Sequence, residues 1–433
     1  MNGDNMGILI RNARFIVSPL ENYEISILEN KNIFIEDNKI ECIGDKCGDK
    51  KDIVIDSSKH VVTPGLINAH THAAMVFLRG SLPDAEFWEW LPRIIDIEEK
   101  LVNKELVFHA SRLACLEMLA NGIAGFIDMY YHPLETLKAC QEYGLFIATG
   151  PVYKNEKRQQ VEEFYREAMK YRNHIPIVNI HSLYSQPEEE LLEAHTFSLE
   201  KSIRLQIHVS ETRKEVFLLK KKTGSWPVEY MYKKKLLDKN TILVHANWLT
   251  STELEYVAEK RSYMVTCPHT SMRLAEAGFT PVYEALEKGI ILGIGTDGSS
   301  GDRYNILDEM KELVLLYRHN YWDTRLSIKY VYPRLVLNNY KIMGIEGGII
   351  KPGYPAHITL LRIDPIKHTP LKKDNVLARL ILSSEFYVDY TIINGIIRYD
   401  SSLFEEYIDK VRNSLQYIER VADKIDYEKG VVK

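Results

Sequence analysis

Between about residues 63 and 345, short apolar runs alternate with longer segments of helical spacing, and this alternation restricts the fold most strongly. Near-continuous apolar runs are typical of buried parallel strands, and the helices between them complete β/α units. Eight such runs occur, ending at His70–His72 in the first and then spanning Gly122–Met129, Gly144–Tyr153, Ile175–His181, Ile203–His208, Thr241–His245, Ser262–Cys267 and Gly289–Gly295. Eight units in about 280 residues predict an α/β fold of the (β/α)8 TIM-type barrel class, with a doubly wound open sheet as the alternative.

Both ends of the chain are rich in strand-like segments and lack the alternation of strands and helices seen in residues 63–345. Strand-like segments occur in the first 62 residues, as in Ile33–Asp37, and return after the barrel region in His357–Leu361 and Phe386–Arg398. We therefore expect a small β-sandwich domain built from residues 1–62 and 346–400, flanking a catalytic barrel at 63–345. The tail, 401–433, has apolar residues at helical spacing, which predicts an amphipathic helix packed on the body.

Composition excludes several classes of protein. Apolar residues make up 45% of the chain and charged residues 27%, which are ordinary globular values, and the net charge is −5. This balance gives no general attraction to nucleic acid or to anionic membranes. Met1–Asn5 lacks the basic start of a signal peptide, and no apolar run is long enough for a membrane helix. We expect a soluble cytoplasmic protein whose five cysteines, none in a C-x-x-C pair, are free thiols.

Metal-binding residue types follow several of the predicted strands. His70 and His72 are two residues apart on the first strand, so both side chains point to one face. The other candidates, His208, His245 and Asp297, come at the ends of later strands, where barrel enzymes place their catalytic groups. Imidazoles and a carboxylate gathered at one end of a barrel predict a metal site.

A carboxylate lies close to this predicted site. Glu211 follows His208 by three residues, which brings it near the metal without requiring that it be a ligand. A carboxylate beside a metal-activated water can move protons. Glu211 is therefore the candidate acid and base of a hydrolytic reaction.

At this point the chain resembles the amidohydrolase superfamily, in particular the branch of S-adenosylhomocysteine/5′-methylthioadenosine deaminases and related chlorohydrolases. The segments that carry the resemblance are distributed along the barrel: PGLINAHTHAAMVFLRG (64–80), GIAGFIDMYY (122–131), HVSET (208–212), VHANWL (244–249) and LGIGTDG (292–298). The resemblance implies a metal-dependent hydrolytic deaminase that removes an exocyclic amine from a purine nucleoside or related heterocycle and releases ammonia.

The resemblance also implies roles for individual residues. One divalent metal, zinc before iron or manganese, would be bound by His70, His72, His208 and Asp297. Glu211 and His245 would be catalytic together with Asp297, with Glu211 transferring a proton to a ring nitrogen. A single metal is expected because Ile175–His181 contains no Lys to bridge two ions.

Substrate contacts follow from the same resemblance. Glu98 matches a residue that binds ribose hydroxyls, His181 one that contacts the purine, and Arg158 one that holds the carboxylate of adenosylhomocysteine. A second carboxylate-binding Arg of that branch is Thr149 here, and segment 267–272 departs from the usual pattern, so adenosylhomocysteine is in doubt as the substrate.

The resemblance makes a homo-oligomer plausible. Two alternatives remain: a cyclic amidohydrolase or triazine-type chlorohydrolase with the same metal site, and a non-catalytic binding protein.

Overall fold

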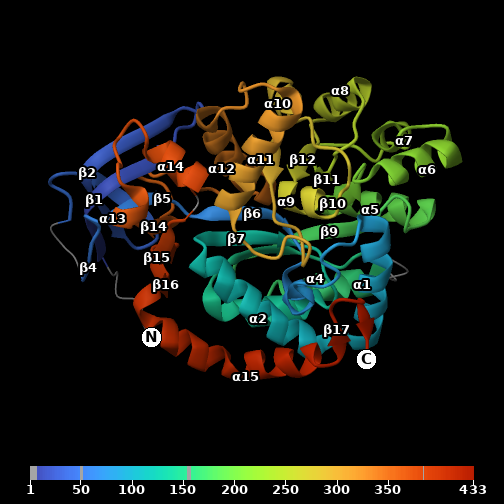
Figure 1. Ribbon diagram of the computed structural model, residues 1–433, viewed down its shortest axis with the longest axis horizontal. Helices are drawn as coiled ribbons and strands as arrows, with labels where there is room; N and C mark the ends of the chain where they lie inside the picture. Colours follow the sequence, from blue (N-terminus) through green and yellow to red (C-terminus); the bar gives the residue numbers. More distant parts are fainter. Residues whose placement is uncertain (1–6, 49–51, 154–157, 384) are drawn as a thin grey trace.

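The centre of the molecule is a parallel barrel sheet, seen in a computed structural model that describes residues 7–48, 52–153, 158–383 and 385–433 (Figure 1). Its eight strands pair in chain order: β6 (Leu66–Thr71), β7 (Ile123–Asp128), β8 (Phe146–Thr149), β9 (His174–Ser182), β10 (Arg204–Val209), β11 (Thr241–His245), β12 (Tyr263–Thr266) and β13 (Leu292–Ile294). A parallel bridge from Thr71 to Asp297 joins the first strand to the segment after the last. The predicted (β/α)8 barrel is confirmed, because strand order never reverses as it does in a doubly wound sheet.

Helices connect successive barrel strands and cover the sheet from outside (Figure 1). They include α1 (Phe87–Leu101), α2 (Lys104–Ala120), α3 (Pro133–Cys140), α4 (Arg158–Ala168), α5 (Glu188–Lys201), α6 (Arg213–Thr223), α7 (Pro227–Lys233), α8 (Ser251–Lys260), α9 (Pro268–Arg273), α10 (Val282–Glu287), α11 (Ile306–Tyr321) and α12 (Ile328–Met343). Between strands and helices lies a continuous apolar core that includes Phe126, Ile180, Leu243 and Leu292, as burial of both faces of a parallel sheet requires.

Strands from the two ends of the chain form a second sheet (Figure 1). They are β1 (Gly7–Pro19), β2 (Ile25–Glu36), β3 (Lys39–Gly44), β4 (Ile53–Asp56), β5 (His60–Pro64), β14 (Ile358–Arg362), β15 (Tyr387–Ile393) and β16 (Ile396–Asp400). The antiparallel pair β5–β14 connects the N-terminal strands to the C-terminal ones within one eight-stranded sheet. β5 continues directly into β6, so this sheet is linked to the first barrel strand.

The C-terminal helix α15 (Phe404–Ala422) packs along α2. His109 Nδ1 on α2 lies 2.9 Å from Ser414 Oγ on α15, and the rings of His109 and Tyr417 stack at 4.7 Å. Beyond it, the short strands β17 (Ile425–Asp426) and β18 (Val431–Val432) reach α1, where Arg93 Nη1 donates to the carbonyl of Lys429. The tail therefore braces the helix that covers the candidate site described below.

The cysteines correct one expectation from the sequence. Cys42 pairs with Cys47 and Cys115 with Cys140 in disulfides, and Cys267 is the buried free cysteine. The expectation of free thiols is wrong for the four paired residues. The packing of α2 against α3 places the Cα atoms of Cys115 and Cys140 5.8 Å apart, within the usual disulfide range, and sequence spacing does not reveal such packing.

None of the described helices is long and apolar enough to span a bilayer.

Candidate active site

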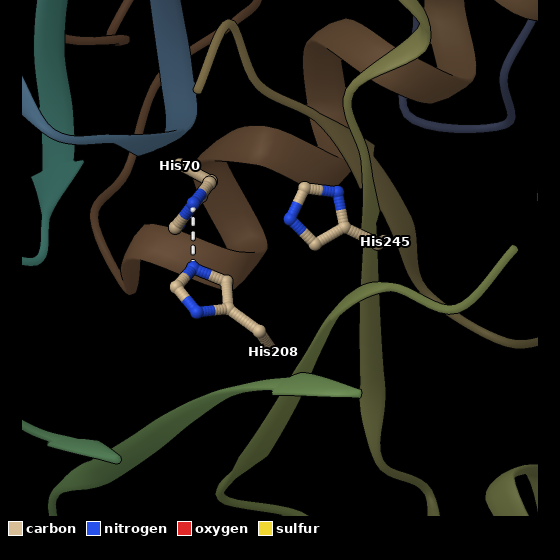
Figure 2. A group of neighbouring side chains, drawn as sticks. All are labelled: His70, His208 and His245. Carbon is tan, nitrogen blue, oxygen red and sulfur yellow. Dashed lines mark hydrogen bonds between the residues drawn. The ribbon is translucent and has the colours of Figure 1, made fainter. Parts of the chain in front are cut away.

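Histidines from three barrel strands converge at the carboxyl end of the barrel (Figure 2). Nε2 of His70, on β6, lies 3.1 Å from Nε2 of His208, on β10, and the ring of His245 at the end of β11 stands beside both. Asp297 Oδ1 lies 3.4 Å from Nε2 of His70 and 3.2 Å from Nε2 of His72. The residues predicted as ligands are therefore neighbours around one point.

Residues behind the histidines fix which ring nitrogen faces this point. Gln206 uses its amide nitrogen to donate to Asn179, so its oxygen, 3.0 Å from Nδ1 of His70, accepts a hydrogen bond from that nitrogen. Nδ1 of His72 donates to the carbonyl of Met129 in the same way. With Nδ1 as the donor in both rings, the Nε2 atoms face inward, which is how proteins orient metal-binding histidines.

The donor set fits one divalent cation. Burial, followed by the charges of neighbouring histidines, lowers the pKa of His208 well below its usual value, so its ring is neutral and can act as a ligand. Burial opposes the ionisation of Asp297, but its contacts with His70 and His72 hold its pKa well below the usual range. Neutral imidazoles with one carboxylate are the ligand types that zinc prefers.

The backbone is strained where these strands end. Ser210, His245 and Asp297 have positive φ angles of 53°, 69° and 61°. Non-glycine residues seldom adopt this left-handed region, and such strain is concentrated at functional sites, where the surrounding structure enforces it. The positive φ angles occur where β10, β11 and β13 give way to loops that carry the polar groups of the site.

The loop after β10 holds Glu211 in a defined position. Thr212 caps α6, and Glu215 completes the capping box. The carboxylate of Glu215 also accepts hydrogen bonds from the backbone N–H groups of Ser210 and Glu211. Glu211 itself is 6% exposed, and its Oε1 lies 3.4 Å from Nε2 of His245.

A cavity of about 460 Å³ opens above this cluster. Helix α1 forms an apolar wall with Phe87, Trp90, Leu91, Ile94 and Ile95, and His72, His208, Glu211, His245 and Asp297 lie along the floor. Glu98 is a polar exception on α1: it is 7% exposed and accepts a hydrogen bond of 2.6 Å from the hydroxyl of Tyr130. Burial raises the pKa of Glu98 to about 7 against the lowering effect of Tyr130. The cavity is large enough for a nucleoside-sized ligand.

The predicted substrate contacts divide into two groups. Glu98 and His181 line the cavity, and the His181 ring centroid lies 5.3 Å from that of His208. Arg158 does not line it: the guanidinium pairs with Glu200 and Glu162 on the outer surface, so a contact with substrate is not supported. Among residues 154–158, Arg158 alone belongs to the described part of the chain. Thr149 is buried, and its hydroxyl donates to the carbonyl of Asp128.

Several site residues were missed by sequence reasoning. Gln206 is two residues before His208 on β10, and this same-face spacing could have identified it. Tyr130 lies in a segment that was quoted for the family resemblance, but nothing in the sequence connects it to Glu98. Glu276, which lies against Glu211, comes from a loop without a recognisable motif. Asn247 lies in VHANWL, a segment that carries the family resemblance, but nothing in the sequence connects it to Glu211.

A family comparison covers the part of the chain that forms this site. Residues 61–397 match the model of the amidohydrolase family, which is well over half of the chain. The chain belongs to the amidohydrolase family. Its first strand motif, its later histidines and Asp297 all fall within the matched region.

Curated amidohydrolases resemble it over nearly their whole length. A 5-methylthioadenosine/S-adenosylhomocysteine deaminase of Pyrococcus furiosus is 32% identical over 402 residues, covering 90% of this chain and 94% of that protein. A 5′-deoxyadenosine deaminase of Methanosphaera stadtmanae is 33% identical over 370 residues, covering 82% and 86%.

Solved structures share the fold at lower identity. An adenosine deaminase from Xanthomonas campestris with bound zinc has a TM-score of 0.86 at 21% identity, covering 96% of this chain and 99% of that one. A zinc complex of an atrazine chlorohydrolase from Arthrobacter aurescens has a TM-score of 0.83 at 17% identity, covering 94% and 100%.

Proposed function

We propose that this amidohydrolase is a metal-dependent deaminase that hydrolyses the exocyclic amine of an adenosine-type nucleoside and releases ammonia. The convergence of His70, His72, His208 and Asp297 beside Glu211, on the floor of a nucleoside-sized cavity, carries the proposal. The names of the curated relatives support the same reaction and substrate class. Ring amides and chlorotriazines are alternative substrates that would react at the same residues, so they belong in the substrate panel.

We propose zinc as the metal, with His70, His72, His208 and Asp297 as its ligands. When bound, zinc supplies the Lewis acidity that makes water a nucleophile near neutral pH. The inward-facing Nε2 atoms and the ionised Asp297 support this ligand set. We also expect a homo-oligomer, because the family resemblance favours an assembly. We expect the protein to be cytoplasmic.

The protein groups account for the proton transfers of deamination. Glu211 gives a proton to the ring nitrogen beside the attacked carbon, and Asp297 takes one proton from the attacking water. That proton reaches the departing amine, while the remaining water proton returns to Glu211 as the carbonyl forms. The products are ammonia and the oxo nucleoside, and the enzyme groups end as they began. His245, 3.4 Å from Glu211, is placed to orient the water and stabilise the developing oxyanion.

The other end of the cavity suits a ribose with an uncharged 5′ substituent. The carboxylate of Glu98 is oriented by Tyr130 and is suited to accept hydrogen bonds from ribose hydroxyls. The α1 wall is apolar apart from Glu98 and Glu99, and no Lys or Arg occurs among the described residues that line the cavity. We infer that 5′-methylthioadenosine and 5′-deoxyadenosine are preferred over S-adenosylhomocysteine, whose charged amino-acid end would lose hydration against this wall.

A substrate panel tests this preference. With zinc-loaded protein, we expect kcat/KM for ammonia release to be at least about tenfold higher for 5′-methylthioadenosine than for S-adenosylhomocysteine, a difference of about 1.4 kcal/mol. The panel includes adenosine, guanine, cytosine, a cyclic ureide and a chlorotriazine. Ring opening or chloride release without ammonia would contradict the deaminase and favour a cyclic amidohydrolase or a chlorohydrolase instead.

Glu98→Gln is expected to weaken ribose recognition. Loss of charge-assisted hydrogen bonds, each contributing about 1.5–3 kcal/mol, should raise KM for 5′-methylthioadenosine by roughly 10- to 100-fold with a smaller change in kcat. The matched control is 2′,3′-dideoxyadenosine, which lacks the hydroxyls and should show no such increase. An equal increase in KM for both nucleosides would mean that Glu98 does not bind the ribose.

A further inference from the structure

A second buried carboxyl group lies against Glu211 and has no part in the reaction described above. Glu276 follows α9 in the loop before α10 and is 2% exposed. Its Oε2 accepts a hydrogen bond of 2.9 Å from Nδ2 of Asn247, which also donates to Ser271 Oγ and to the carbonyl of Glu211. Its Oε1 is buried and has no hydrogen-bond donor among the described residues.

The unpartnered oxygen belongs to a close group of three side chains. One ligand-type atom from each of Glu211, His245 and Glu276 lies within 4.8 Å of the other two. Two carboxylates this close in a buried site resist simultaneous ionisation, so the resting pair holds one proton. A proton shared by the two carboxyl groups supplies the hydrogen bond that joins Glu276 to Glu211.

The surroundings determine which of the two carboxyl groups carries this proton. Burial raises the pKa of Glu276 to about 8, while hydrogen bonds from Ser271 and Asn247 oppose this rise and favour the ionised form. Burial first, and the carboxyl of Glu276 next, raise the pKa of Glu211 well above its usual value. The other groups that face Glu211 are Glu215, Asp297, His245 and the buried hydroxyl of Tyr184. The proton therefore belongs with Glu211.

We propose that Glu276 is a positioning residue for Glu211: the two side chains share one proton, which keeps Glu211 protonated and aimed at the substrate. The proposal rests on the role of Glu211 as proton donor in the proposed deamination. In it, Glu276 stays ionised and does not touch the substrate, and the proton that Glu211 delivers to the ring nitrogen returns from the water. Glu276 thus extends the alkaline range over which the donor is ready.

The pH profile of Glu276→Gln tests this role. The amide can donate to an ionised Glu211 and removes the neighbouring negative charge, so Glu211 should lose its proton at lower pH. We expect the alkaline limb of the kcat/KM profile for 5′-methylthioadenosine to move down by about one pH unit or more, with metal content and KM unchanged. Glu276→Asp should restore part of the wild-type profile. A Glu276→Gln profile that overlays the wild type, or a loss of bound metal, would overturn the proposal.

Two further variants separate this effect from general damage. Glu253→Gln is the matched control, because Glu253 is also a buried carboxyl, but its oxygens accept hydrogen bonds from the backbone N–H groups of Val228 and Thr250. Its kcat/KM profile should match the wild type. Ser271→Ala removes a donor to Glu276 with little change in volume. It should move the alkaline limb in the same direction as Glu276→Gln but less far, and it provides the test if the latter does not fold.

A stability measurement tests the shared proton without any activity. A buried carboxyl whose pKa is raised in the folded protein stabilises the fold as long as it keeps its proton. This stability is lost as pH rises from the pKa of the group in the unfolded chain through its pKa in the folded one. Replacing either Glu211 or Glu276 with Gln relieves the same repulsion. Each single variant should therefore gain melting temperature over the wild type at pH 9 more than it does at pH 6. In the double variant this gain should be clearly smaller than the sum of the two single gains. Additive gains would mean that the two groups titrate independently. If no panel substrate is deaminated, the proposed function fails, yet this cycle still decides whether the proton is shared.

Discussion

His70→Ala and Asp297→Ala are each expected to abolish both metal binding and turnover. His70 is fully buried, and its Nε2 faces His208 and Asp297 at 3.1 Å and 3.4 Å, so its removal takes a central member from the ligand set. Asp297 is the one carboxylate in that set, and its loss leaves the charge of a divalent ion uncompensated. Metal analysis after zinc loading should fall from about one equivalent per chain to near zero.

The control for this pair is His319→Ala, which removes an exposed histidine on α11 far from the ligand set. It should keep both metal and activity. Retained turnover in His70→Ala or Asp297→Ala would contradict the proposed ligand set, even if metal were found elsewhere on the protein.

Glu211→Gln should abolish turnover while keeping the metal. Gln is nearly isosteric, and Glu215 still holds the backbone of the loop, so the position of residue 211 should be preserved. The amide cannot carry the proton to and from the ring nitrogen, and loss of general acid–base catalysis typically costs about 10²–10⁴-fold in rate. Steady-state kcat and metal content are measured on the same sample.

KM for 5′-methylthioadenosine should change little in Glu211→Gln, because the ribose contacts are at Glu98. A variant that retains more than about a tenth of kcat would remove Glu211 from the role of proton carrier. One that loses its metal would instead make Glu211 a ligand.

Periodicity and local motifs predicted the parts of the molecule that depend on local sequence. The eight apolar runs matched the eight barrel strands because burial on both faces leaves few polar residues in them. The side chains of His70, His72, His208, His245 and Asp297 came together because parallel strands bring their carboxyl ends to one edge. Glu211 was identified by its distance from His208 along the chain.

Contacts between distant elements could not be predicted in this way. The hydrogen bond between Glu98 and Tyr130 joins α1 to the loop after β7, and the contact of Glu276 with Glu211 joins the loops after α9 and β10. The disulfide between Cys115 and Cys140 depends on how α2 packs on α3. Arg158 was assigned to the substrate from the family resemblance, yet it pairs with Glu200 outside the cavity.

Ammonia release from 5′-methylthioadenosine by metal-depleted and zinc-reloaded protein tests the central claim most directly. The account predicts no ammonia after chelation, recovery in proportion to zinc bound up to about one equivalent, and no recovery in His70→Ala. Ammonia release that is independent of zinc content would contradict the proposed metal chemistry. A reloaded protein that binds one zinc but releases no ammonia from any nucleoside of the panel would contradict the proposed reaction.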